Sequence, residues 1–414
     1  MSFPGPPTRR GLLGAAFGLG LGAGCVCTTA PPAAARPAPP AGPAPSSGGP
    51  PPDKGTHLVM LGTQGGPIPG RRAATSTALV VNGAVYLVDA GSGLPVRFYE
   101  LGLDFARVRA MFITHLHSDH YADAFNFFSV NWTNWDFPSQ QVQVHGPGRA
   151  DRSDEGRAPV PGLPSTPYAD LVRPDLPTPG IVDFFEASVS ANAYDINERL
   201  RSTRRSDGVP MDLTGTSGPA LMVPHGMALP EAASFSNRVP VMKPVHVYED
   251  DLVRVTAVLV DHPPVFPAFA FRFETADETI VFSGDTSPND NLMEFARGAD
   301  ILVNEVMDID AATAQFAGLP IEKTMQEQFT SAHTPSRDWT SPVTGRTKPG
   351  VGNVARRTDV GALVLNHVYP GDGTVPDSRF HNDARGVYRR TVVVSRDLMV
   401  LDTAELSARR TRRP

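Results

Sequence analysis

The chain has 414 residues, 41% of them hydrophobic, and this length is enough for one large core with shorter segments beside it. Its formal net charge of −6 gives no overall basic excess for binding a phosphate backbone, which argues against nucleic acid as a partner. Cys25 and Cys27 both precede the region that we expect to fold. A disulfide or a thiolate ligand is therefore excluded from that region.

Residues 1–35 have the pattern of an export signal. Arg9-Arg10 precedes an apolar stretch, which is typical of the twin-arginine route. Ala33-Ala34-Ala35 predicts cleavage, and a lipid anchor at Cys25 is the alternative. Residues 36–55 are a Pro/Ala-rich linker that cannot bury a core. We therefore predict a periplasmic, cell-surface or extracellular protein whose mature chain has no transmembrane span.

Residues 56–402 alternate between strand and helix patterns, which is typical of an α/β fold. The predicted strands are 57–62, 77–81, 85–88, 108–114, 141–145, 245–248, 253–260, 268–273, 279–282, 301–303, 362–365, 392–395 and 399–401. The predicted helices are 94–101, 124–136, 191–205, 289–297, 321–329, 351–356 and 377–388. Residues 403–414 are expected to form a solvated basic tail.

Two stretches bear on a binding site. The helix 124–136 is rich in aromatic residues, which we interpret as core, with a pocket floor of Trp132, Trp135 and Phe137 as the alternative. Residues 149–243 are rich in Pro and thin in apolar content. We predict that they form an insertion over the site and not a second domain.

Four metal-binding side chains lie within six positions, at His115, His117, Asp119 and His120, directly after a short apolar strand. Side chains alternate along an extended segment, so His115 and His117 point the same way and can hold one ion. Asp119 and His120 come where the chain should turn into a helix, from Tyr121 onward, and are directed at a second ion. This density of donors favours a metal site over a polar loop.

Three further donors leave the ends of predicted strands. His262 follows strand 253–260, Asp285 follows strand 279–282, and His367 follows strand 362–365. Each enters a turn that contains Gly or Pro, where functional groups are commonly displayed. A structural role is an equal alternative for either histidine alone, but the first cluster favours the metal interpretation for all three.

In order along the chain, the motifs VDAGSG, HLHSDH, SGDT, NEV, AHT and NHVYP resemble those of the metallo-β-lactamase fold superfamily. They are most similar to its branch of ribonuclease Z and the metallo-type arylsulfatases. The resemblance covers residues 56–402. It implies a four-layer αβ/βα sandwich with the site at one edge of the two sheets and residues 149–243 as a covering insertion.

The resemblance also implies two zinc ions, with manganese or iron as alternatives because the His/Asp set is not metal-exclusive. One ion would be held by His115, His117 and His262, the other by Asp119, His120 and His367, and both by Asp285. Asp89 would orient a ligand histidine. Catalytic roles are implied for Asp119, for His333 as the acid that protonates the leaving oxygen, and for Glu305 as its partner. A capping or surface role is the alternative for His333.

Two divalent ions that share one water would hold a hydroxide at neutral pH and offset charge on the attacked group. We therefore predict an exported dinuclear zinc hydrolase of sulfate or phosphate esters, with a small anionic ester as substrate. A ribonuclease Z-like phosphodiesterase is the first alternative, although the interval between His262 and Asp285 is too short for the RNA-gripping arm of that branch. Further alternatives are a lactonase or β-lactamase and a non-catalytic exported metal-binding protein. For the oligomeric state, the hypothesis is a homodimer.

Overall fold

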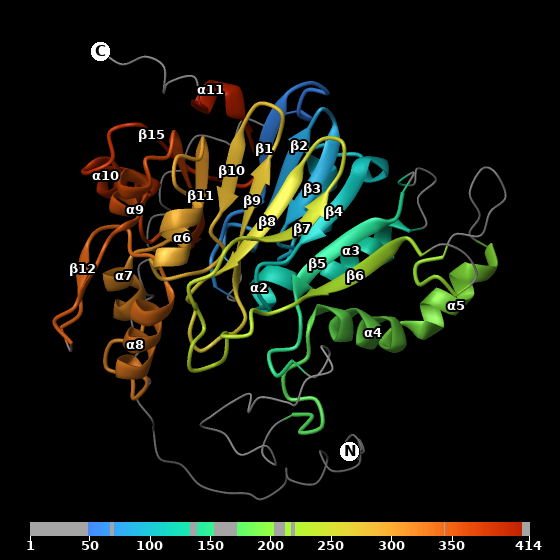
Figure 1. The fold of residues 1–414 in the computed structure, drawn as a ribbon, viewed down its shortest axis with the longest axis horizontal. Coiled ribbons are helices and arrows are strands. Elements are labelled where there is room, and N and C mark those ends of the chain that lie inside the picture. Colours follow the sequence, from blue (N-terminus) through green and yellow to red (C-terminus); the bar gives the residue numbers. More distant parts are fainter. Residues whose placement is uncertain are drawn as a thin grey trace, which may run out of the picture. The chain divides into compact units, whose positions relative to one another are not determined.

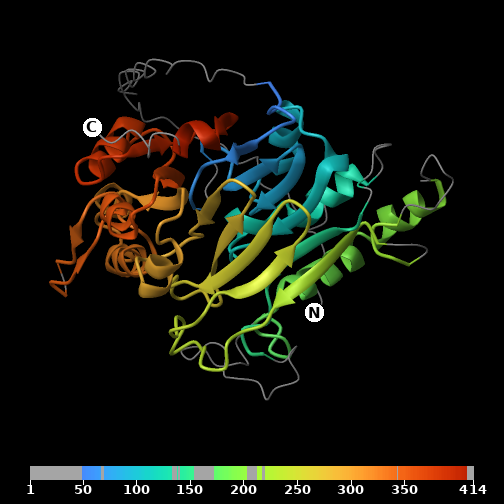
Figure 2. The ribbon, with the colours of Figure 1, turned by 45° about the horizontal axis from the view of Figure 1, so that its top comes forward.

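The computed structural model describes residues 49–66, 70–132, 138, 140–152, 172–202, 212–216, 220–342 and 344–407 of the chain. Two seven-stranded sheets lie against each other, and helices cover their outer faces (Figures 1 and 2). The layers therefore follow the order helix, sheet, sheet, helix. This arrangement confirms the αβ/βα sandwich that the sequence predicts.

The first sheet is built mainly from the first half of the chain. In spatial order its strands are β16 (Met399–Asp402), β1 (Thr56–Gly62), β2 (Ser76–Val81), β3 (Ala84–Val88), β4 (Val108–Phe112), β5 (Val142–Pro147) and β6 (Met222–Met227). β1 pairs antiparallel with β16 and β2, and β3 pairs antiparallel with β2. From β3 to β6 the pairing is parallel, so these strands end at one edge of the sheet.

The second sheet is built from the second half. Its strands, in spatial order, are β15 (Thr391–Val394), β14 (Ala362–Tyr369), β11 (Ile301–Met307), β10 (Thr279–Phe282), β9 (Phe269–Glu274), β8 (Arg254–Leu259) and β7 (Val245–Glu249). β10, β11, β14 and β15 are parallel. β8 and β10 both pair antiparallel with β9, so they run in the same direction. The ends of β8, β10, β11 and β14 therefore share one edge.

Helices pack on both outer faces. On the first sheet these are α1 (Leu94–Glu100), α3 (Ala124–Asn131), α4 (Ile181–Ala191) and α5 (Ala193–Ser202). On the second sheet these are α6 (Asp290–Phe295), α9 (Val351–Thr358) and α10 (Asp377–Arg385). The remaining elements are η1 (Phe105–Arg107), α2 (Ser118–Tyr121), α7 (Ile309–Ala314), α8 (Glu322–Ala332), the hairpin of β12 (Trp339–Thr340) and β13 (Thr347–Lys348), and α11 (Thr403–Ser407).

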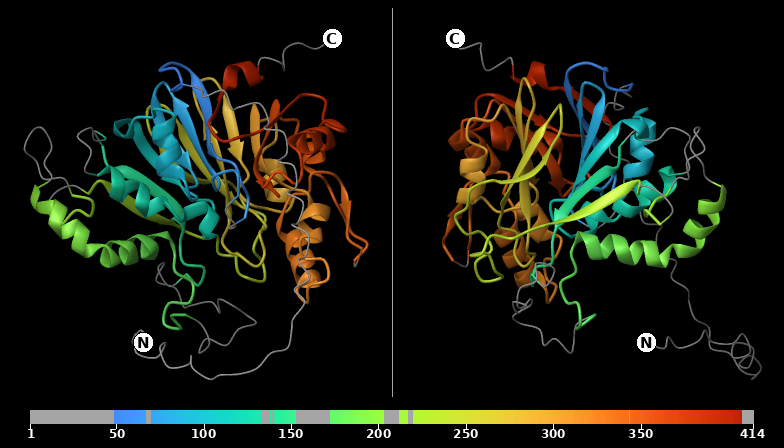
Figure 3. Two further views of the ribbon diagram at one scale, coloured as in Figure 1. Left: turned by 180° about the vertical axis from the view of Figure 1, so that it is seen from behind. Right: turned by 45° about the vertical axis from the view of Figure 1, so that its right-hand side comes forward.

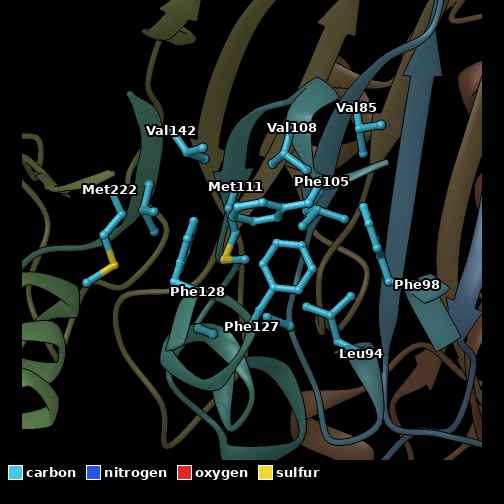
Figure 4. Packing of buried hydrophobic residues seen from close by; sticks show 14 of the residues in the cluster. Val85, Leu94, Phe98, Phe105, Val108, Met111, Phe127, Phe128, Val142 and Met222 are labelled. Atoms are coloured by element: carbon cyan, nitrogen blue, oxygen red, sulfur yellow. The ribbon is translucent and has the colours of Figure 1, made fainter. Parts of the chain in front are cut away.

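Buried apolar side chains join the layers. Successive residues of a strand point to opposite faces, so Val85 packs outward against the helices while Tyr86 packs between the sheets. Figure 4 shows the outward group, in which Phe98 of α1 and Phe127 of α3 meet beneath the first sheet. Trp132 belongs to the same buried group, so its predicted alternative role as a pocket floor is wrong. Trp135 and Phe137 lie outside the described residues.

The described part of 149–243 extends the sandwich. The structure has two helices, α4 and α5, where the sequence predicts one. α4 lies beside β5 and β6, and α5 continues outward from α4 (Figure 3). β6 is not predicted because Pro224 and Gly226 argue against a strand, but it is an edge strand, where Pro is tolerated. Phe185 of α4 is buried against α3. These elements extend the first two layers and do not form a separate cover.

Other boundaries also differ from the prediction. β11 and β14 run on to Met307 and Tyr369, and α7, β12 and β13 are not predicted at all. Residues 403–407 form α11 and not a tail, because Leu406 is buried and Thr403 donates to the Thr56 carbonyl. The remaining tail and the signal and linker up to residue 48 lie outside the described residues. Within the described part, no helix is both long enough and apolar enough to cross a bilayer.

Candidate metal centre

The predicted ligands converge at the edge where β4, β8, β10 and β14 end. His115 and His117 lie between β4 and α2, whose four residues include Asp119 and His120. The helix thus begins at Ser118, three residues earlier than predicted. His262 follows β8, Asp285 follows β10, and His367 lies inside β14 next to a register shift. The topology therefore assembles donors that are up to 252 positions apart, from residue 115 to residue 367.

Three histidines form one group. His117 Nδ1 lies 3.1 Å from His115 Nε2 and 3.1 Å from His262 Nε2, so the three nitrogens face one point. Burial lowers the pKa of all three imidazoles, and that of His262 falls to about 3. They are therefore held neutral, which is the form that binds a metal ion.

A second group contains carboxylates. Asp119 Oδ2 lies 3.3 Å from His367 Nε2 and 3.7 Å from His120 Nε2. Asp285 stands between the groups, with Oδ2 3.1 Å from His367 Nε2 and 3.9 Å from His262 Nε2. Its Oδ1 lies 3.4 Å from His120 Nε2, yet neither atom has a hydrogen-bond partner although both are buried. A cation bound between these two buried polar atoms would give each of them a partner.

The electrostatics of this second group also call for a cation. Burial lowers the pKa of His120, but Asp285, Asp89 and Asp119 raise it well above its usual value. Burial raises the pKa of Asp285, but His367 and His120 bring it well below the usual value. The carboxylates therefore stay charged and draw protons onto neighbouring imidazoles. A bound cation can take the place of those protons, so the residues present fit a metal.

Hydrogen bonds behind the ligands fix their orientation. His120 Nδ1 donates to Asp89 Oδ2 over 2.8 Å, and Asp89 also accepts from the Thr114 amide and hydroxyl. His262 Nδ1 donates to the Ala332 carbonyl over 3.1 Å. In both histidines Nδ1 donates to the protein, so Nε2 is the nitrogen that can bind an ion. The structure thus places Asp89 in contact with a ligand histidine, where the resemblance implies it.

His333 and Glu305 form a buried pair beside the cluster. His333 Nδ1 donates to the Glu305 carboxylate, at 3.1 and 3.0 Å from its two oxygens, and lies 3.9 Å from Asp285 Oδ2. Glu305 also accepts from the Thr286 and Thr334 amides. Burial raises the pKa of Glu305, while His333 opposes the rise. The bond through Nδ1 leaves His333 Nε2 for a substrate.

The spacing of these donors permits more than one grouping. Overlapping sets of three that could hold an ion include His262, Asp285 and His333 as well as Glu305, His333 and His367. His333 Nδ1 already has a hydrogen-bond partner, because it contacts both carboxylate oxygens of Glu305. The buried Nε2 of His120 has none. The seven predicted ligands occur in these overlapping sets together with His333 and Glu305, and the assignment of ligands remains a prediction.

Comparison with known proteins agrees with this geometry. Residues 69–191 match the family model of the metallo-beta-lactamase superfamily. The crystal structure of human tRNase Z, short form, superimposes with a TM-score of 0.50 at 17% identity, over 83% of this chain and 98% of that one. The chain has the metallo-beta-lactamase fold.

Relatives with this metallo-beta-lactamase fold include ribonucleases. The chain is 26% identical to ribonuclease Z of Mycobacterium bovis (strain BCG / Pasteur 1173P2) over 344 residues, which are 83% of this chain and 96% of that enzyme. It is 28% identical to ribonuclease Z of Mycolicibacterium gilvum over 315 residues, which are 76% and 84% of the two chains. These similarities indicate a metal-dependent hydrolase, and the His/Asp clusters suit a dinuclear metal site. They also weaken the argument against nucleic acid.

The metallo-beta-lactamase fold also brings residues to the site that the sequence does not point to. A cavity of about 250 Å³ beside the ligands is lined by apolar side chains of α8 and of the ends of β11 and β14. These residues belong to no sequence motif, because isolated apolar residues in a helix pattern are interpreted as core residues. Outside the ligand groups, His145 stacks on Phe112 and on His225. That stack joins β4, β5 and β6 and leaves both histidines out of the ligand groups.

Proposed function

We propose that the chain is a metal-dependent phosphodiesterase similar in chemistry to ribonuclease Z. The ribonuclease Z relatives cover 83% of the chain, and this ranks the phosphodiesterase above the sulfate or phosphate ester hydrolase that we predicted first. The observation that carries the proposal is the His333–Glu305 pair next to Asp285. Ester cleavage needs a proton for the departing oxygen, and a metal-storage protein has no use for such a pair.

The residues of the candidate site have three proposed roles: binding metal, orienting a ligand and donating a proton. His115, His117 and His262 would hold one ion, Asp119, His120 and His367 the other, and Asp285 both, with zinc as the proposed metal. When bound, two divalent ions lower the pKa of a coordinated water and offset the charge of the attacked phosphate. Asp89 keeps His120 in the tautomer that a ligand needs. Glu305 orients His333, whose Nε2 donates a proton to the leaving oxygen.

A sulfate or phosphate ester of a small organic group is the second candidate. It is favoured by the cavity, because the described residues that line it include no Lys or Arg to bind a long polyanion. We also propose that residues 1–35 direct export of the enzyme and that the enzyme forms a homodimer. An exported enzyme would meet small esters more readily than precursor transfer RNA.

The test is a substrate panel with the zinc-loaded enzyme and a His333→Ala variant. The panel holds a phosphodiester, a phosphate monoester, an aryl sulfate, a lactone, a β-lactam and a precursor transfer RNA. We expect phosphodiester hydrolysis that falls by about 10² to 10⁴ in His333→Ala, with metal content unchanged. The loss should be larger for an alkyl than for a nitrophenyl leaving group, because nitrophenolate leaves without a proton.

The matched control is His381→Ala, which removes a partly exposed histidine of α10 that hydrogen-bonds its neighbour Asn382. This variant should keep the wild-type rate on every substrate. Equal rates for His333→Ala and wild type would remove His333 from the mechanism. A metal-loaded enzyme that cleaves no diester in the panel would refute the proposed function.

A further inference from the structure

The cavity beside the ligands has two different sides. Its polar side is formed by ligand residues and by His333. The apolar lining residues, which we name the apolar wall, are Met307, Phe316, Met325, Phe329 and Tyr369. These residues come from the ends of β11 and β14, from α8, and from the turn after α7 (Figure 1). A substrate bound at the ions would therefore have one flank against apolar side chains.

Aromatic rings dominate the wall. The ring centroid of Phe329 lies 5.8 Å from that of Phe316 and 5.8 Å from that of Tyr369, with tilts of 54° and 46°. The Tyr369 hydroxyl donates to Gln315 Oε1, which turns the polar end of the side chain to a partner. Phe329 is buried, whereas Phe316 and Tyr369 are half-buried. Ring faces that keep part of their surface exposed beside a reactive centre are typical of a binding surface.

The wall carries no positive charge for a second anionic group. Among the described lining residues of the cavity there is no Lys or Arg. The nearby arginines have acidic partners, since Arg337 pairs with Asp310 over 2.5 Å and Arg379 with Asp308 over 2.7 Å. An ester group that extends over the wall is therefore best uncharged, because desolvating a second phosphate there would be costly.

We propose that the apolar wall binds a flat, uncharged ring, so that the substrate is a small phosphodiester with one charge and one ring-bearing ester group. This inference rests on the proposed phosphodiesterase activity. His333 lines the same cavity, which places the ring on the leaving side. The P–O bond to the ring-bearing oxygen breaks, and a P–O bond to water forms. That oxygen takes the proton of His333, the attacking water loses a proton to solvent, and His333 regains a proton from solvent. The products are a monoester and a ring-bearing alcohol.

The test compares two methyl phosphodiesters whose leaving alcohols are equally acidic, one an aryl and the other a fluorinated alkyl group. Equal acidity removes the chemical difference, so any preference reports binding of the ring. Wild-type holoenzyme should favour the aryl ester by about 10-fold or more in kcat/KM, the range for an apolar contact. Phe316→Ala and Met325→Ala should abolish most of this preference, because they should lower kcat/KM for the aryl ester much more than for the alkyl ester.

Both substituted side chains are partly exposed, so the variants should fold, and circular dichroism checks this. The control is Leu319→Ala, an apolar residue between α7 and α8 that is 50% exposed and does not line the cavity. A binding readout is the affinity of a non-hydrolysable aryl phosphonate ester, which should fall about 10-fold in Phe316→Ala and not in Leu319→Ala.

Different failures have different meanings. No preference between the two diesters, or variants that slow both equally, would overturn the assignment of the wall. Precursor transfer RNA that is cleaved faster than both small diesters, without sensitivity to the wall variants, would also overturn it and leave the phosphodiesterase intact. Absence of hydrolysis for every diester would instead refute the proposed function.

Discussion

Replacing Asp89 with Asn tests whether the ligand arrangement depends on a tautomer. Asp89 is buried after β3 and accepts from the Thr114 amide, the Thr114 hydroxyl and His120 Nδ1. An Asn side chain has nearly the same shape and can still accept from the Thr114 amide. Its NH₂ group, however, donates and cannot accept the Nδ1 proton of His120.

The expected consequence is a change of tautomer at His120. With an amide NH₂ opposite Nδ1, the imidazole is more stable with its proton on Nε2, the atom that faces Asp119 and Asp285. The lost hydrogen bond to a charged acceptor contributes about 1.5 to 3 kcal/mol. This range corresponds to about a 10- to 100-fold weaker metal affinity, which is the usual cost of losing such a partner.

Metal affinity is measured by competition with a chromophoric chelator after the protein has been stripped, with ions per chain counted by elemental analysis. We expect Asp89→Asn to keep the fold and the first ion but to lose affinity for the ion at Asp119, His120 and His367. The control is Asp123→Asn, since the Asp123 carboxylate accepts hydrogen bonds from the Gly93 amide and the Asn126 side chain. A variant Asp89→Asn that binds two ions with wild-type affinity would refute this reasoning.

Two further predictions concern stability. Burial, followed by His225 and His246, lowers the pKa of His145 from 6.5 to about 4, so the unfolded state binds more protons between these values. This group should therefore lower the free energy of unfolding, measured with denaturant, by about 2 kcal/mol between pH 7 and pH 5. The unfolding free energy of His145→Phe should depend less on pH than that of wild type. An equal pH dependence in the two proteins would contradict the assignment. Phe127→Ala should cost about 3 to 5 kcal/mol in unfolding free energy without changing activity per folded molecule, because Phe127 packs against Phe98 and Phe105; a changed substrate preference would place α3 at the site after all.

Much of the architecture is local and was predictable. Strands with apolar runs such as 279–282 and helices with capping residues such as Asn289 were placed to within a few residues, because period and turn chemistry act over short distances. The errors fall where long-range contacts overrule local preference. β6 contains Pro and Gly and is a strand only because the edge of β5 offers it a partner.

The candidate site divides in the same way. His115, His117, Asp119 and His120 could be recognised from the sequence, because their spacing alone brings four donors together. The position of His367 inside β14, next to Asp119, depends on how the second sheet lies against the first. Local sequence therefore predicts that a metal is bound, while the packing of the sheets decides how the donors are grouped.

The sequence by itself determined the donor types, the strand ends that display them, and the absence of cysteine from the folded region, since these depend on residue identity and local periodicity. Only the tertiary structure decided which apolar side chains lie beside the candidate metal ligands. The residues of the apolar wall are distant in sequence from residues 115–120, and they include Phe316, Phe329 and Tyr369. Apolar residues such as these form no recognisable sequence motif. Their common surface exists because Phe329 of α8 contacts Tyr369 at the end of β14, and such a long-range contact depends on the whole fold.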